Sequence, residues 1–106
     1  MSDRWSGANF RNIIDVASDL FEMEHGIAVP AETREALRKP ALPHAREVAR
    51  ALDRREITLD FLIDSVHEIL ENSLPLLEQS ERVAGMVSVQ SVQRSMKRKC
   101  PYAFWC

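Results

Sequence analysis

The side chains best suited to bind a transition metal are three histidines and two cysteines: His25, His44, His67, Cys100 and Cys106. Structural zinc sites place such ligands in close pairs, and two histidines one helical turn apart can also share a metal. The two cysteines lie six positions apart, and the histidines are much farther from one another. This spacing predicts no metal site, and we expect no cofactor. A disulfide between the two cysteines is geometrically possible, although two cysteines are too few for a disulfide scaffold.

Acid–base chemistry is a second option, because His67 lies within one helical turn of Asp64 and Glu71. Carboxylates on the outer side of an amphipathic helix are, however, usually only solvated. The chain has three glycines and contains neither a Gly-rich phosphate loop nor a nucleophile elbow. We therefore expect that the protein is not an enzyme.

These acidic residues and His67 belong to the strongest helical pattern in the chain, the segment from Thr58 to Leu70. Apolar residues recur there at steps of three and four, which places them on one side of a helix, and the pattern continues to Leu77. The carboxylates lie on another side, and the hydroxyl of Thr58 can cap the helix start. This helix is predicted to form the centre of the core.

Further helices are predicted around it. The first ends before Gly26, which can adopt the left-handed conformation of a helix end. A short helix runs roughly over residues 31–38, and Pro40 is expected to stop it, because proline lacks a backbone donor. Pro43 can open the next helix, since a first-turn residue needs no such donor.

The last part of the chain is predicted to form a longer C-terminal helix, from Pro75 to Lys99. Residues 86–90 also resemble a strand, because Gly85 and several valines favour one locally. Helix is preferred, since the sequence offers no second strand to pair with it. The fold class expected is all-α, a small bundle of four to five helices.

Length and composition indicate one helical domain over residues 1–106, with an aromatic tail at 100–106. No apolar run approaches the roughly 20 residues that span a bilayer, and residues 1–7 lack an apolar signal region, so we expect a cytoplasmic protein without integral membrane association. Residues 1–80 contain nine basic and fifteen acidic residues, whereas residues 81–106 contain five basic residues and one acidic residue. The acidic body disfavours nucleic acid as a partner.

Helix-turn-helix DNA binding is the alternative function. Residues 49–59 loosely resemble the spacing of that motif, but Asp53 stands where a turn glycine is expected. The recognition helix would present Asp60 and Asp64 to the DNA, and carboxylates repel phosphates. A plain helical hairpin is the preferred interpretation.

Surplus apolar residues near the C-terminus indicate a protein partner. The predicted partner-binding residues are Met86, Val87, Val89, Val92, Met96, Tyr102, Phe104 and Trp105. They can alternatively fill the core or the seam of a homodimer, which small helical proteins often form, and the basic aromatic tail could also touch an anionic membrane. With a partner surface here, charged substitutions at Val89 or Val92 should abolish binding and preserve the helical signal.

The whole chain resembles the QslA-type quorum-sensing antiactivators. The resemblance lies in its length, its short-helix opening, the acidic amphipathic helix at Thr58–Leu70 and the long segment Pro75–Lys99. It implies a helical homodimer that binds the ligand-binding domain of a LuxR-type transcription factor. By occupying the dimerisation surface of that factor, such a protein would prevent DNA binding.

Overall fold

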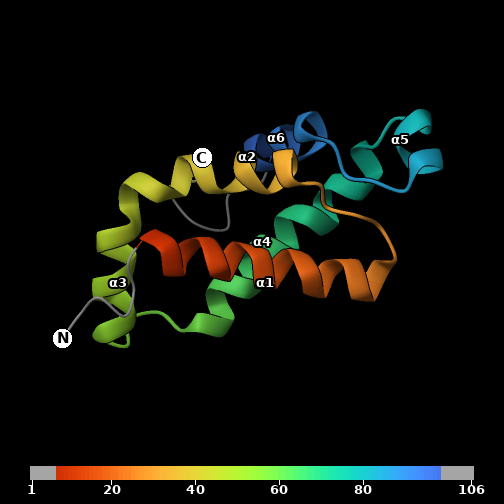
Figure 1. Cartoon of the computed structure of the whole chain (residues 1–106). Helices are drawn as coiled ribbons and strands as arrows, with labels where there is room; N and C mark the ends of the chain where they lie inside the picture. Colours follow the sequence, from red (N-terminus) through yellow and green to blue (C-terminus); the bar gives the residue numbers. More distant parts are fainter. Residues whose placement is uncertain (1–6, 99–106) are drawn as a thin grey trace.

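The computed structural model of the protein describes residues 7–98, and this part of the chain is helical, without a β-strand (Figure 1). The prediction of an all-α fold is confirmed. In chain order the α-helices are α1 (Gly7–His25), α2 (Ala31–Ala41), α3 (Ala45–Asp53), α4 (Leu59–Ser73), α5 (Gln79–Ala84) and α6 (Val89–Arg98). A short 3-10 turn, η2 (Leu42–His44), precedes α3, and another, η3 (Leu74–Leu76), follows α4. Within residues 7–98, no helix is both long and apolar enough to cross a membrane.

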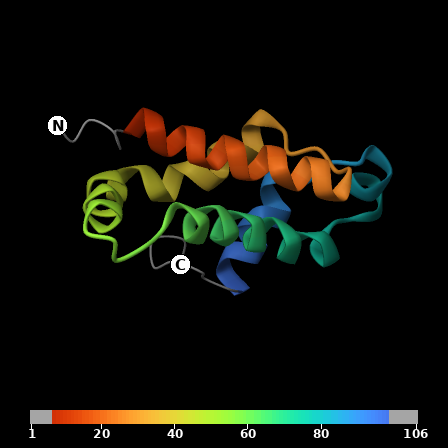
Figure 2. The ribbon, with the colours of Figure 1, turned by 90° about the horizontal axis from the view of Figure 1, so that it is seen from below.

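Four helices close a ring around the core. Helix α1 packs on α4, α4 on α6, α6 on α2, and α2 on α1. Helices α1 and α4 run in the same direction (Figure 2), while α3 and α5 lie at opposite ends of the molecule (Figure 1). The largest fully buried apolar side chains come from the four helices of the ring, from α3 and from the segment before α6: Ile14, Phe21, Leu37, Val48, Leu62, Val66, Ile69, Leu70, Val87 and Val92.

Helix α4 has the central place that its sequence pattern predicts. It lies between α1 and α6, and it buries an apolar side that consists of Leu62, Val66, Ile69 and Leu70. Its start is also as predicted, because the hydroxyl of Thr58 accepts a hydrogen bond from the backbone N–H of Phe61 at 3.1 Å. Leu59 differs from the pattern, since it stays partly exposed at the start of the helix.

Replacing Thr58 with alanine is expected to destabilise the fold by about 1 kcal/mol, because a free N–H in the first turn of α4 loses its acceptor. Urea denaturation followed by circular dichroism measures this loss. Thr58→Ser is the matched control, since serine restores the acceptor and should recover most of the stability. Equal destabilisation by both substitutions would contradict a capping role.

Helix α2 continues past the proline that was expected to stop it. Pro40 lies inside the helix, which ends at Ala41. The missing donor and the crowding by the proline ring affect only the preceding turn, and the N–H of Leu42 still bonds the carbonyl of Arg38. The loss therefore falls on the last turn, where it is tolerated. Pro43 lies in η2 and leads into α3, which agrees with its predicted position at a helix start.

The longer C-terminal helix predicted from Pro75 to Lys99 is wrong for the described residues, which form η3, α5 and α6 instead. Helix α5 ends because Gly85 adopts a left-handed conformation, with φ +68°. The chain then pairs with the loop after α1. Ala28 donates to the carbonyl of Gly85 at 2.8 Å, and Val87 donates to the carbonyl of Ala28 at 2.9 Å. This single parallel bridge between Ala28 and Met86 supplies the partner that the strand-like pattern lacked.

A reciprocal capping box fixes the start of α5. The Glu78 side chain accepts from the N–H of Glu81, and the Glu81 carboxylate accepts from the N–H of Glu78 at 2.8 Å. The pKa of Glu81 is lowered chiefly by a hydrogen bond from Ser88. The hydrogen bond from the Glu78 backbone and the charge of Arg94 lower it further, and these effects outweigh the small opposing effect of burial. The ionised form is the one that holds this turn, so its contribution is lost only as the pH falls through that lowered pKa.

Two arginines of α2 hold the acidic second half of α1. Arg34 contacts Asp19 at 2.8 Å, Glu22 at 3.1 Å and Asp15 at 3.5 Å, and Arg38 also pairs with Asp15. The Arg34 Nε donates to the carbonyl of Val29 at 2.9 Å, at the bridge segment. The carboxylates that the dipole of α1 disfavours near its end are therefore compensated by α2.

Candidate functional site

The structure divides the predicted partner-binding residues into three groups. Val87 and Val92 are fully buried and Met96 is 8% exposed, so these three belong to the core and their prediction as a partner surface is corrected. The reason is that α6 is a side of the helical ring, and its apolar residues face inward. Met86 is 38% exposed and Val89 is half-buried. Tyr102, Phe104 and Trp105 lie outside the described residues.

Met86 and Val89 border a hollow of about 250 Å³ between the start of α2 and the segment before α6. Its lining is Pro30, Glu32, Thr33, Met86, Val87, Ser88, Val89 and Gln90. The hydroxyl of Thr33 already donates to the carbonyl of Val87 at 2.6 Å. The Thr33 hydroxyl is therefore committed to holding α2 against the segment before α6.

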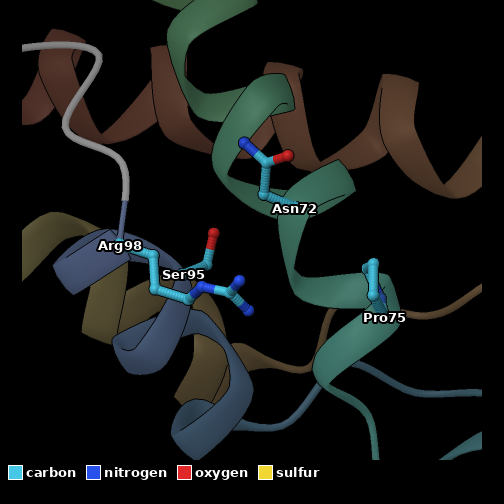
Figure 3. A pocket seen from close by; sticks show the side chains of 4 residues that line it. All are labelled: Asn72, Pro75, Ser95 and Arg98. Carbon is cyan, nitrogen blue, oxygen red and sulfur yellow. The ribbon is translucent and has the colours of Figure 1, made fainter.

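Another hollow, of about 290 Å³, lies between the end of α4 and α6 (Figure 3). It is lined by Asn72, Pro75, Ser95 and Arg98, and the Arg98 side chain extends past Ser95 into the space between the two elements. The Ser95 hydroxyl donates to the carbonyl of Ile69 at 2.7 Å, so it is committed to packing α6 on α4. Among the described residues, the lining therefore offers the Arg98 guanidinium beside a hydroxyl that is already hydrogen-bonded.

The most distinctive surface is the groove between α1 and α4, which has a volume of about 400 Å³. Its lining is Leu20, Met23, Glu24, Ile63, Asp64 and His67. Sequence periodicity places Leu20 in the buried stripe of α1, but it is 45% exposed, and Met23 is 83% exposed. Helix α1 therefore has a second, outward apolar row, which combines Val16, Leu20 and Met23 at helical spacing.

The same groove ends at a cluster of two histidines and two carboxylates. His67 of α4 contacts Glu24 of α1 through Nε2 at 2.9 Å and Glu71 through Nδ1 at 2.9 Å. The His25 Nε2 lies 3.6 Å from the Glu71 carboxylate. Beneath the cluster, the buried Phe21 ring lies 4.6 Å from the His25 ring and 5.7 Å from the His67 ring.

The sequence interpretation missed this cluster, because it judged the histidines only by their spacing along the chain. The rings of His25 and His67 lie 5.7 Å apart, because α1 and α4 pack in parallel. A signal was present in the sequence: His25 follows Phe21 by one helical turn, and His67 follows Ile63 by one turn. Both histidines thus extend apolar stripes that meet in the core.

The outward side of α4 argues against a recognition helix. Asp60, Asp64 and Glu71 are exposed along it, and its apolar side is used by the core. A helix that presents carboxylates to solvent is poorly suited to the major groove.

Comparisons with protein-family models, with curated proteins and with solved structures found no match to this chain.

Proposed function

We propose that this protein works by binding another protein in the α1–α4 groove, and not by catalysis. The observation that carries the proposal is the outward apolar row of α1, which borders a groove that the partly buried Ile63 of α4 also lines. Val16 and Met23 are seven positions apart, which is about 10 Å along a helix. This length suits two turns of an amphipathic helix laid into the groove.

The carboxylates at the groove indicate the charge of the partner helix that would suit it. Glu24 and Asp64 line the groove, and Asp60 is exposed on α4 one turn before Asp64. An apolar strip between carboxylates favours a partner helix with apolar residues at steps of three and four and basic residues at its flanks. The proposed partner is therefore a basic amphipathic helix of a regulatory protein.

The resemblance to the QslA-type antiactivators supports a specific form of this proposal. The partner helix would belong to the ligand-binding domain of a LuxR-type transcription factor, at the surface through which that factor dimerises. Covering this surface in the cytoplasm would prevent DNA binding and make the protein a negative regulator. The proposal includes a homodimer, because small helical domains with surplus apolar surface commonly associate.

The test is binding of the purified full chain to the purified ligand-binding domain of a LuxR-type factor, measured by calorimetry, together with its oligomeric mass. We expect the double substitution Leu20→Ser and Met23→Ser to weaken binding about 30-fold or more, because the groove loses two exposed apolar contacts. Wild-type protein should also release the factor from duplex DNA in a gel-shift assay.

Val83→Ser is the matched control, because Val83 is 82% exposed and lies on α5, away from the groove. It should bind like wild type. Circular dichroism should show the same helical signal in all variants, since none of the three residues is buried. A wild-type chain that fails to bind the domain, or a groove variant that binds as tightly as Val83→Ser, would contradict the proposal.

A further inference from the structure

We propose that Glu24, His25 and His67 form a binding site for a divalent transition metal of the zinc class. Each of the three side chains offers one ligand atom, and these atoms lie within 4.8 Å of one another. Two imidazoles and one carboxylate are the donor set that open zinc sites use, with the fourth position left to water. This inference does not depend on the proposed partner.

The two contacts of His67 are the main geometric observation for the site. Both of its ring nitrogens face a carboxylate at 2.9 Å, Nδ1 that of Glu71 and Nε2 that of Glu24. A neutral imidazole has one N–H, so it can donate to only one of them. If Nδ1 donates to Glu71, the lone pair of Nε2 faces the Glu24 oxygen, and a cation between them would satisfy both atoms. The alternative is an imidazolium that donates to both.

The distance between the His67 and Glu24 ligand atoms is close to the spacing of two ligands on a zinc ion. Two ligands of a tetrahedral zinc ion, each about 2.0–2.2 Å from it, lie roughly 3.3 Å from each other. The 2.9 Å between the Nε2 of His67 and the Glu24 oxygen needs only a small opening to admit the ion. Both side chains project from helices, and Glu24 is 61% exposed, so a change of rotamer can supply it.

His25 supplies the third ligand. Its Nε2 is buried and makes no hydrogen bond within the part of the chain that the structure describes, since its nearest polar contact is the Glu71 carboxylate at 3.6 Å. A buried imidazole nitrogen in this state is costly, and coordination would satisfy it. The Phe21 ring packs against both imidazoles and restricts their orientation.

Glu71 completes the site without being a ligand. By accepting the N–H of His67 Nδ1, its carboxylate fixes the tautomer that presents Nε2 to the metal, as in carboxylate–histidine–zinc arrangements. The two carboxylates bring two negative charges, which a divalent ion balances. Helix α1 also ends at His25, and the negative end of its dipole favours a cation there.

The open position faces water. Glu24 and His67 line the end of the α1–α4 groove, so one side of the site remains accessible. A water molecule, or a donor atom of a molecule bound in the groove, can fill the fourth position. The geometry assigns binding of the metal and no chemical step.

The experiment is a calorimetric titration of the chelator-treated full chain with ZnCl₂. It is done in a Cys100→Ser, Cys106→Ser background, because thiolates also bind zinc. We expect one zinc ion per chain with micromolar affinity or tighter. Titration with Co²⁺ should produce the visible absorption of a low-coordinate cobalt ion with nitrogen and oxygen ligands.

The variants separate ligands from support. Single substitutions His25→Ala, His67→Ala and Glu24→Gln should each weaken zinc binding by at least 100-fold. Glu71→Gln should weaken it by 10- to 100-fold at unchanged stoichiometry, because it only orients His67. Glu24→Gln is the variant least able to disturb the fold, since Glu24 is largely exposed. His44→Ala is the control and should bind as the parent does, because His44 lies in η2 and pairs with Glu47.

Three results would overturn the site. The first is a parent chain that binds no zinc at micromolar concentration. The second is zinc binding that survives both His25→Ala and His67→Ala. The third is binding lost equally in His44→Ala. Because the Leu20→Ser, Met23→Ser variant keeps all three ligands, it should bind zinc normally, so failure of the metal site and failure of the partner groove are distinguishable.

Discussion

Replacing Val92 with aspartate is expected to unfold the protein. Val92 is fully buried on α6, where it belongs to the core between α6 and α4. An aspartate there would place a carboxylate among apolar side chains without a partner, and remove apolar contacts as well. The cost is about 4 kcal/mol or more, a large fraction of the roughly 5–15 kcal/mol that stabilises a small domain. Far-ultraviolet circular dichroism and urea denaturation measure it.

Val83→Asp is the matched control, because the same substitution at a residue that is 82% exposed should leave the helical signal unchanged. This comparison replaces the sequence-based expectation that a charge at Val92 abolishes partner binding within an intact fold. A helical, cooperatively unfolding Val92→Asp variant would contradict the position of α6 in the ring. Val89, which is half-buried, remains a position where the earlier expectation can be tested.

Replacing Arg34 with glutamine is expected to destabilise the fold by about 2 kcal/mol. The substitution removes the cation that faces three carboxylates of α1, and it weakens the bond to the carbonyl of Val29. Breaking a buried pair costs about 3–5 kcal/mol, and we reduce this figure because Arg34 keeps 16% of its side chain exposed and Asp19 keeps 61%. Thermal and urea denaturation measure the loss.

The charges around Arg34 determine the pH range over which this stabilisation is present. Burial by itself would lower the pKa of Arg34, but the hydrogen bond and charge of Asp19, with Glu22 and Asp15, outweigh it and raise that pKa. A raised pKa means that the stabilisation is complete below the ordinary value of arginine and is lost only at higher pH. The arginine therefore stays charged at every pH used for folding experiments.

Salt should separate this network from ordinary packing. The difference in unfolding free energy between wild type and Arg34→Gln should shrink as ionic strength rises, because the exposed part of the network is screened. Arg46→Gln, a substitution of an exposed arginine on α3, is the control and should change stability by less than about 0.5 kcal/mol. A salt-independent loss at Arg34 would assign its role to packing alone.

Local patterns predicted much of the fold because their causes are local. The stripe of α4, its cap at Thr58 and the end of α1 at Gly26 depend on residues within a turn or two of each other. These local patterns do not contain the contacts between distant segments. The strand-like residues before α6 find their partner in Ala28, and the carboxylates of α1 find theirs in Arg34 and Arg38.

The candidate site was less predictable for the same reason. His25 and His67 become neighbours only through the parallel packing of α1 and α4, which no spacing within one helix reveals. The apolar surplus of the last segment proved to be core at Val87 and Val92, because α6 is a side of the ring and not an added arm. The surplus that reaches solvent lies instead on α1, at Leu20 and Met23.

The closed ring has a consequence for synthesis on the ribosome. Helix α1 docks on α4, and Thr33 of α2 bonds to Val87, 54 positions later in the chain. At about 5–20 residues per second, that separation takes roughly 3–10 s to translate. The face of α2 that packs on the segment around Val87 therefore emerges long before the segment that covers it, so the nascent chain has a window in which this face is open to chaperones or to other nascent chains.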